Sequence, residues 1–261
     1  MTAHGGFEHN LQSLRVVDRL EQRYGAFDGL NLTFETREGI LKHCSVVNAQ
    51  TLGEIGQRFI DKKQPTLEAQ LANFADEIAY NNHDIDDGLR SGLLSVVQLD
   101  EVDLYARHRR EVETTFPVIS GRRAINETVR RMINALIVDL TDTSQQRIDL
   151  AQVGSTDDVR NGAALIMFSP AIQQQASLLK QFLRENLYRH YLVNRMTSKA
   201  RRIITELFDA FMGEPRLLPP DYQSADTDST SQARTIADYI AGMTDRYAIR
   251  EHRRLFMVDE I

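Results

Sequence analysis

Three polar residues spaced four apart, Asp76, Tyr80 and Asp84, are the strongest candidates for chemistry in this sequence. On an α-helix, each residue of such a series is turned only about 40° from the one before, so both carboxylates and the phenol share one face. Carboxylate oxygens suit hard or borderline divalent ions, and a tyrosine ring can pack on a sugar while its hydroxyl donates a hydrogen bond. A row of a carboxylate, a phenol and a second carboxylate can bind a metal and, beside it, a polyhydroxy ligand. A solvated acidic face is the alternative, because Asp86 and Asp87 follow at once.

Clustered arginines are a second candidate group. A guanidinium group can bind two phosphate oxygens at once, because its N–H donors lie in one plane. By residue type alone, the candidates for phosphate binding are two pairs in one predicted helix: Arg122, Arg123, Arg130 and Arg131. A solvated helix face is again the alternative interpretation.

The motifs of other enzyme classes are missing. The sequence has no Gly-rich phosphate loop, no CxxC or HExxH zinc pattern and no GxSxG serine motif. His83 and Asp84 form an adjacent His–Asp pair, but IDDG rather than further histidines follows it. His43 and Cys44 are neighbours in a helical pattern, so they point about 100° apart and do not form a nucleophile–base pair.

Composition narrows the class of protein. The chain has 261 residues, of which 42% are hydrophobic, which suffices for one large domain or two small ones. No apolar run approaches the roughly 18 residues that span a bilayer, and the single Cys44 cannot form an internal disulfide, which favours a cytoplasmic location. A net charge of −6 and the absence of Trp argue against a general nucleic-acid coating protein.

Helical periodicity dominates the elements that must position these side chains. The pattern predicts an all-α, multi-helix protein, with a long helix that begins at Thr66 after Pro65. The other expected helices cover residues 7–24, 32–47, 100–113, 121–141, 169–191, 198–212, 232–247 and 249–256. Residues 163–168 could form a short strand, and residues 213–231 resemble a linker rich in Pro, Asp and Ser.

Four blocks of the sequence, in this order, resemble the bacterial dGTP triphosphohydrolase-like (dGTPase-like) proteins: GGFEHNLQSLRVVDRLEQRY, GLNLTFETREGILKH, ADEIAYNNHDIDDGLRSG and IADYIAGMTDRYA. The resemblance covers essentially the whole chain. It implies part of an HD-domain helical bundle over residues 1–115 and a phosphohydrolase-associated helical region over residues 116–261. It further implies a cytoplasmic, metal-binding hydrolase of nucleotide metabolism that converts a deoxynucleoside triphosphate to deoxynucleoside and triphosphate, with Mg²⁺, Mn²⁺ or a similar divalent metal as cofactor and a homo-oligomeric assembly.

The resemblance also implies roles for individual residues. Asp76 is similar to the last metal ligand of the family's H…HD…D set. Tyr80 and Asp84 are similar to the residues that meet the deoxyribose near its 3′-hydroxyl, and His83 to a neighbour of that site. The four arginines named above are candidates for the triphosphate by residue type and are not aligned one by one.

One departure from the family pattern concerns the other metal ligands. The family's first metal His, its HD pair and the following His and acidic residues precede the GGFEHN block, whereas only residues 1–4 precede it here. The chain therefore resembles the carboxy-terminal two-thirds of such an enzyme. We expect it to lack metal binding and activity in isolation, and to expose apolar surface near Phe7 that favours association. The alternatives are a non-catalytic remnant that binds nucleotides or oligomerises, and a helical scaffold without a ligand.

Overall fold

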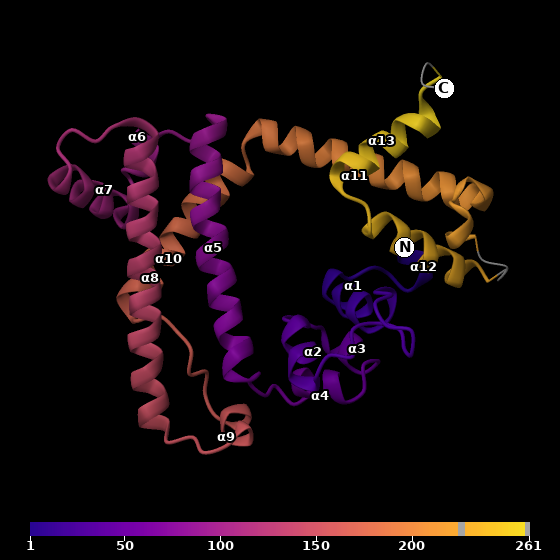
Figure 1. Ribbon diagram of the computed structural model, residues 1–261, viewed down its shortest axis with the longest axis horizontal. Coiled ribbons are helices and arrows are strands. Elements are labelled where there is room, and N and C mark those ends of the chain that lie inside the picture. The colour runs from indigo at the N-terminus through magenta and orange to yellow at the C-terminus, as the bar shows by residue number, and fades with distance from the viewer. Residues whose placement is uncertain (224–227, 259–261) are drawn as a thin grey trace. The chain divides into compact units, whose positions relative to one another are not determined.

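The computed structural model describes residues 1–223 and 228–258, and every regular element within them is helical (Figure 1). No strand occurs in this part of the chain, which confirms the all-α prediction. None of these helices has the length and apolarity needed to cross a bilayer. The α-helices are α1 (His9–Arg15), α2 (Phe34–Ile40), α3 (Val46–Ala49), α4 (Glu54–Ile60), α5 (Leu67–Ser91), α6 (Val96–Leu99), α7 (Asp103–Thr115), α8 (Gly121–Ala151), α9 (Thr156–Asn161), α10 (Pro170–Leu183), α11 (Tyr191–Gly213), α12 (Ser229–Ala241) and α13 (Asp245–Phe256). Short 3₁₀ or π turns are η1 (Thr2–His4), η2 (Val16–Leu20), η3 (Arg184–Tyr188), η4 (Pro215–Leu217) and η5 (Pro220–Tyr222).

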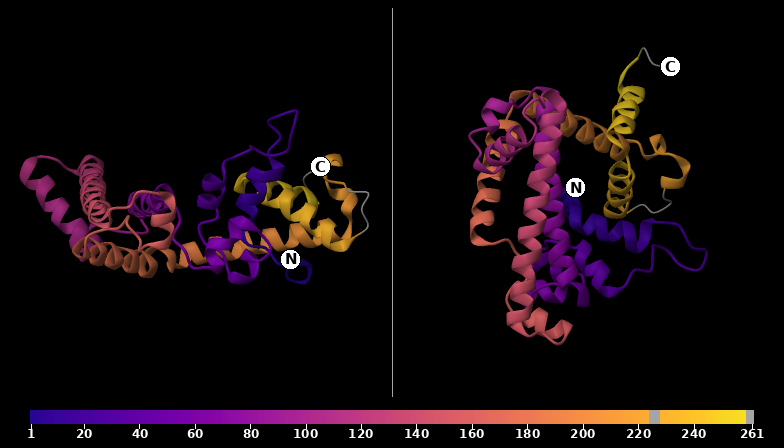
Figure 2. Two further views of the ribbon diagram at one scale, coloured as in Figure 1. Left: turned by 90° about the horizontal axis from the view of Figure 1, so that it is seen from below. Right: turned by 60° about the vertical axis from the view of Figure 1, so that its left-hand side comes forward.

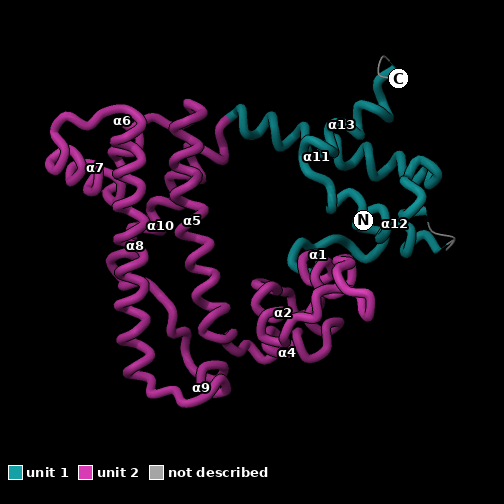
Figure 3. Tube along the Cα trace, viewed as in Figure 1, with its two compact units in different colours: residues 1–12, 191–261 teal, residues 13–190 magenta. Residues whose placement is uncertain are grey.

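The chain divides into two compact units (Figure 3). Residues Ser13–His190 form one, which we call the main unit, and Met1–Gln12 with Tyr191–Ile261 form the other. Every candidate site residue named above lies in the main unit. The division into family regions at residues 115 and 116 stays a prediction.

Helix α5 carries Asp76, Tyr80 and Asp84 on one side, which we call the Asp76 face. The ends of this helix follow from its sequence. The Thr66 hydroxyl caps the first turn by accepting a hydrogen bond from the backbone N–H of Ala69, at 3.3 Å. The helix ends at Gly92, which has a φ of 72°, a left-handed conformation that glycine adopts without steric cost. The predicted start of this helix is therefore confirmed.

The core of the main unit lies where α5, α7, α8 and α10 meet. Helix α5 runs alongside α8, and α10 packs against both α5 and α7 (Figures 1 and 2). Burial of large apolar side chains stabilises this packing by roughly 1.5–3 kcal/mol for each one. The most deeply buried of them include Ile85, Leu99, Leu104, Tyr105, Met132, Leu179 and Leu183.

The predicted strand at residues 163–168 is wrong, and side chains take the place of a partner strand. The Oε1 atom of Gln70 on α5 accepts hydrogen bonds from the backbone N–H groups of Leu165 and Ile166, at 3.0 and 3.3 Å. The Ser144 hydroxyl accepts another from Met167, at 3.1 Å. Because buried backbone donors need acceptors, these side chains allow an apolar extended segment to cross the core without a sheet.

Two predicted helices in the amino-terminal part are shorter than expected. The first ends in the π turn η2, since the N–H of Glu21 bonds to the carbonyl of Val16. Helix α2 begins after Thr33, whose hydroxyl accepts a hydrogen bond from the backbone N–H of Thr36, but it ends at Ile40. Cys44 therefore lies in the connection between α2 and α3 rather than in a helix, and it is partly exposed.

A buried ionic cluster joins α2, α4 and α9 in the main unit. The carboxylate of Glu38 is 1% exposed and receives two hydrogen bonds from Arg160, at 2.7 and 3.0 Å. Arg58 donates to the Glu38 backbone carbonyl at 3.3 Å and lies 3.5 Å from its carboxylate. Burial lowers the pKa of Arg58, whereas the hydrogen bonds to Glu38 raise that of Arg160. The cluster fixes the end of α2 just before Lys42.

The second unit has its own apolar core between α11, α12 and α13. Leu207, Phe211 and Ile236 are fully buried there. His252 on α13 pairs with Glu206 on α11. The predicted linker at residues 213–231 contains η4, η5 and the start of α12, and residues 224–227 of it lie outside the described residues.

Candidate functional site

The predicted Asp76 face exists on α5. Asp76, Tyr80 and Asp84 lie on successive turns of this single helix, and the apolar Ile78 points into the core with 5% of its surface exposed. Tyr80 is 58% exposed, which leaves its ring accessible to a ligand. The helix thus separates a polar face from a buried one, as the spacing predicts.

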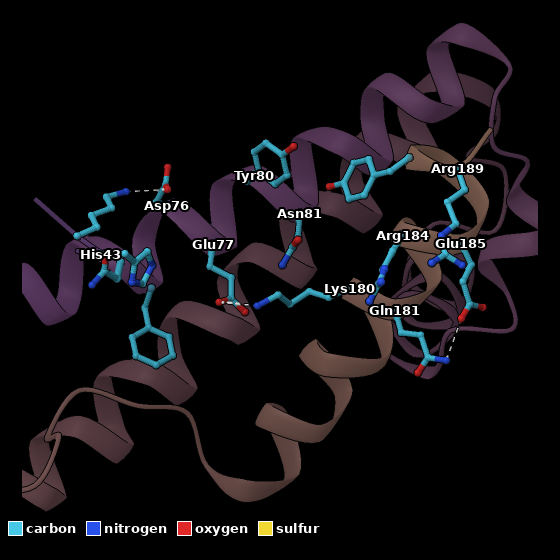
Figure 4. Close-up of a pocket in the computed structure, with 14 residues that line it drawn as sticks. His43, Asp76, Glu77, Tyr80, Asn81, Lys180, Gln181, Arg184, Glu185 and Arg189 are labelled. Carbon is cyan, nitrogen blue, oxygen red and sulfur yellow. Dashed lines mark hydrogen bonds and ion pairs between the residues drawn. The ribbon is translucent and has the colours of Figure 1, made fainter. Parts of the chain in front are cut away.

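A cleft of about 1060 Å³ opens along this face (Figure 4). One wall is α5, and the opposite wall is the carboxy-terminal half of α10 with η3. The connection after α2 contributes Lys42 and His43 at one end. The lining residues are Lys42, His43, Asn73, Phe74, Asp76, Glu77, Tyr80, Asn81, Lys180, Gln181, Arg184, Glu185, Tyr188 and Arg189.

Asp84 is tied to the opposite wall by a tyrosine. The Tyr188 hydroxyl donates a hydrogen bond to the Asp84 carboxylate, and the Tyr188 ring centroid lies 6.2 Å from that of Tyr80. Burial raises the pKa of Asp84, while the hydrogen bond from Tyr188 opposes that shift. Burial and the hydrogen bonds to Asp84 and Tyr80 raise the pKa of Tyr188. The three side chains thus form one polar group at this end of the face.

Several cations that line the cleft are not among the residues that the sequence predicts to bind phosphate. Lys180, Arg184 and Arg189 come from α10, η3 and the residue after η3, about one hundred positions beyond the Asp76 face. A signal for them exists, because Lys180, Arg184 and Tyr188 repeat the spacing of four within the predicted helix 169–191. Nothing in the sequence, however, pairs that helix with α5.

Two ion pairs cross the cleft region. The Lys42 ammonium lies 2.9 Å from an oxygen of Asp76, and the Lys180 ammonium lies 3.0 Å from an oxygen of Glu77 (Figure 4). Both pairs are partly exposed. The carboxylates of Asp76 and Glu77 are therefore paired with cations from other segments of the main unit.

The four arginines expected to bind phosphate lie elsewhere on the main unit. None of them lines the Asp76 cleft. Arg122, Arg123 and Arg130 line a second cavity of about 730 Å³ beside Phe116. Arg130 and Arg131 bind Glu127, whose pKa their hydrogen bonds lower to about 2, and Arg122 pairs with Asp86 at 2.7 Å. The structure thus does not bring these arginines to the carboxylates of the Asp76 face, and their phosphate role stays a prediction.

The carboxylate that resembles a metal ligand, Asp76, belongs to no group of three potential ligands in the part of the chain that the structure describes. In residues 1–223 and 228–258, no three His, Cys, Asp or Glu side chains come close enough together to hold a metal ion. Asp76 instead pairs with the ammonium of Lys42. Because bound divalent ions take several protein ligands, the described residues do not fit a metal by themselves.

Comparison with known proteins agrees with this architecture. Residues 166–254 match the phosphohydrolase-associated domain family. The chain is 65% identical over all of its residues to a deoxyguanosinetriphosphate triphosphohydrolase-like protein of Ralstonia pickettii (strain 12J), of which it covers 67%. It is 62% identical to the protein of the same name from Thiobacillus denitrificans (strain ATCC 25259 / T1), covering 69% of it. A similarly named protein of Bordetella pertussis (strain Tohama I / ATCC BAA-589 / NCTC 13251) is 65% identical over 97% of this chain and 65% of its own length.

The match with these relatives has two parts. It runs through the chain from end to end, including the α5 face and the α10–η3 wall of the cleft. The chain also spans only about two thirds of the length of the curated relatives it matches. Because the identity is 65% and 62% over the whole chain, the chain belongs to the deoxyguanosinetriphosphate triphosphohydrolase-like family.

Proposed function

We propose that the cleft binds a deoxynucleoside triphosphate. The observation that carries this proposal is that one cavity of about 1060 Å³ holds both a sugar-binding type of surface, around Tyr80, and a set of cations, on α10 and η3. The names of the relatives refer to a deoxyguanosine triphosphate, which combines those two chemistries.

The deoxyribose is assigned to the Tyr80 end of the cleft. The exposed ring of Tyr80 offers an apolar surface on which a sugar can pack. Asp84 is not among the residues that line the cleft, but it is bonded to Tyr188, which is. When ionised, its carboxylate can accept a hydrogen bond from a sugar hydroxyl that reaches it. Tyr188 already donates to that carboxylate and fixes its orientation. These contacts support the assignment of Tyr80 and Asp84 as substrate-binding residues.

The triphosphate is assigned to the cations of the opposite wall. Lys180, Arg184 and Arg189 line the same cavity as Tyr80. Lysine offers a mobile positive charge and arginine a planar pair of donors, and both suit phosphate oxygens. This assignment rests on the cavity, whereas the four arginines of α8 lie outside it.

Hydrolysis to deoxynucleoside and triphosphate needs more than this group of residues supplies. The family suggests a divalent metal cofactor, for which Asp76 is the proposed ligand in this chain. Such a metal would supply electrostatic stabilisation of the reacting phosphate. Since the described residues form no group of three potential metal ligands, we propose that this chain binds the nucleotide without hydrolysing it.

Two assignments beyond the cleft complete the proposal. A homo-oligomer is proposed from the resemblance and from exposed apolar side chains such as Phe7, which is 47% exposed. A cytoplasmic location is proposed from the nucleotide substrate and the single cysteine. The competing function, a helical scaffold, gives no role to the cations that face Tyr80.

The proposal is tested by nucleotide binding with a matched pair of variants. Isothermal titration with each of the four deoxynucleoside triphosphates, in EDTA, should show saturable binding to the parent. Tyr80→Ala should weaken it about tenfold, or ~1.4 kcal/mol. Tyr24→Ala is the control, since Tyr24 is equally exposed in the main unit and lies outside the cleft. Absence of binding, or equal effects of the two variants, would contradict the proposal.

Product analysis separates binding from turnover. The parent and Asp76→Ala are incubated with the four nucleotides and Mg²⁺ or Mn²⁺, and the products are separated by chromatography. We expect no deoxynucleoside or triphosphate from either protein. Formation of both products by the parent and not by the variant would overturn the proposed inactivity and identify this chain as an enzyme.

A further inference from the structure

The ion pair between Glu77 and Lys180 lies inside the proposed phosphate-binding part of the cleft (Figure 4). Glu77 follows Asp76 on α5, but it is turned about 100° from it and so reaches toward α10. One of its oxygens lies 3.0 Å from the Lys180 ammonium. Its other oxygen, Oε1, is buried and has no hydrogen-bond partner in residues 1–223 and 228–258. A carboxylate therefore occupies the position where a phosphate oxygen would meet Lys180.

The two partners differ in their freedom to move. The Lys180 side chain is 51% exposed and the Glu77 side chain is 26% exposed. A lysine has a flexible four-carbon stem with three rotatable donors, so its ammonium can turn from one acceptor to another. Glu77 stays on the wall of α5. An incoming phosphate can thus take over the ammonium while the carboxylate remains behind.

The charges of the cleft make this exchange costly for the ligand. Its cations are Lys42, Lys180, Arg184 and Arg189, and its acids are Asp76, Glu77 and Glu185. Lys42 is already held by Asp76 at 2.9 Å. A polyphosphate that enters the cleft is attracted less by a cation that is already paired with a carboxylate. The same carboxylate also repels the phosphates.

We propose that Glu77 is a competing counter-ion that lowers the affinity of the cleft for polyphosphate by holding Lys180. Glu77 is a positioning residue, because it acts through Lys180 and makes no contact with the ligand. The inference rests on the proposed function, in that Lys180 binds the phosphates. Its physical consequence is reversibility: the carboxylate recaptures the ammonium when the anion leaves, which keeps bound triphosphate exchangeable.

The test measures the dissociation constant of inorganic triphosphate by isothermal titration, with EDTA present so that no divalent ion bridges the partners. Glu77→Gln keeps the shape of the side chain and removes its charge. We expect this substitution to tighten binding about threefold to tenfold. It removes both the partly exposed ion pair that holds Lys180 and the repulsion between the Glu77 carboxylate and the phosphates. Glu185→Gln is the matched control, since it removes the same charge from the same cleft while its carboxylate bonds to Gln181, at 3.1 Å, and not to Lys180.

A double-mutant cycle tests whether the effect passes through Lys180. In the Lys180→Gln background, Glu77→Gln should change the dissociation constant no more than Glu185→Gln does. Circular-dichroism melting of each variant checks that α5 and α10 remain packed, since the ion pair also joins these helices. A purely structural role of Glu77 would lower the melting temperature without tightening binding.

The outcomes separate this inference from the proposed function. Triphosphate binding by the parent that Glu77→Gln leaves unchanged or weakens overturns the inference alone. So does an equal gain from Glu185→Gln, or a gain that persists in the Lys180→Gln background. Failure of both the parent and Glu77→Gln to bind millimolar triphosphate overturns the phosphate-binding proposal and this inference together. Binding by Glu77→Gln and not by the parent supports both.

Discussion

Asp84 shows how one residue can serve a site at the expense of stability. Its carboxylate is partly buried beside Tyr188, and burial is the main reason that its pKa lies above the ordinary value of 3.8. A buried ionised carboxylate is less favourable than a neutral one, even where a hydroxyl donates to it. The residue that the substrate hydroxyl would bind is therefore also one that strains the folded state at neutral pH.

Asp84→Asn is expected to melt at a higher temperature than the parent at pH 7. The sign follows from proton linkage: the folded parent holds its proton more tightly than the unfolded chain, so the parent loses stability as pH rises from 3.8 through the raised pKa. Below pH 3.8 both proteins carry a neutral group, and the difference should vanish. Solvent screening keeps the gain at neutral pH under about 1 kcal/mol.

The measurement is a series of thermal melts of both proteins between pH 3 and pH 8, followed by circular dichroism. The same variant should bind deoxynucleoside triphosphate more weakly, because an uncharged amide is a poorer acceptor for a sugar hydroxyl. A melting difference that is independent of pH would show that the carboxylate charge is not its cause.

Among individual residues, the sequence was informative where one helix sets the geometry. The shared face of Asp76, Tyr80 and Asp84 follows from a period of 3.6 and is found in the structure. The residues that contact this face could not be predicted in the same way, because Lys180 and Tyr188 reach it only through tertiary packing of α10 on α5. Local spacing carries no information about such a contact, so residue type alone favours the arginines of α8, which do not line the cleft.

At the scale of elements, Gln70 accepts two of the backbone hydrogen bonds that a partner strand would otherwise accept from residues 163–168. Gln70 is 5% exposed and spans three segments, since it accepts from two residues of the 163–168 segment and donates to the carbonyl of Pro65 at 3.0 Å. The sequence could not predict this arrangement. An apolar run of six residues is equally compatible with a strand, and only the fold places an amide side chain beside it.

Gln70→Ala is expected to destabilise the protein by about 1–3 kcal/mol. The reason is that the buried N–H groups of Leu165 and Ile166 lose their acceptor. Chemical denaturation with urea measures the change. Gln145→Ala is the control, since its exposed side chain bonds only to Asp149 one turn away on α8. We expect that control to change the free energy of unfolding by less than about 0.5 kcal/mol. A loss of similar size in both variants would refute the role of Gln70.

At the scale of the whole molecule, the main unit carries the cleft and a core of its own. Every buried residue of that core lies between Ile78 and Leu187, and all residues that line the cleft lie between Lys42 and Arg189. Because domains fold around their own cores, the unit Ser13–His190 meets the requirements for independent folding.

A fragment of residues 13–190 is therefore expected to fold alone. It should unfold in a single cooperative transition and bind inorganic triphosphate within about threefold of the full chain, a difference below ~1 kcal/mol. Circular-dichroism melting and isothermal titration provide the two measurements. A broad, non-cooperative melt would show that the second unit is needed for the fold of the first, contrary to this expectation.

The order in which the ribosome makes the two walls of the cleft has a consequence for the nascent chain. Tyr80 and Lys180 are 100 residues apart, which at about 5–20 residues per second corresponds to roughly 5–20 s of synthesis. During that interval α5 has emerged with Glu77, while Lys180, the cation that pairs with Glu77, has not yet been translated. The complete set of residues that line the cleft is therefore available to a nucleotide only after Arg189 has left the ribosome.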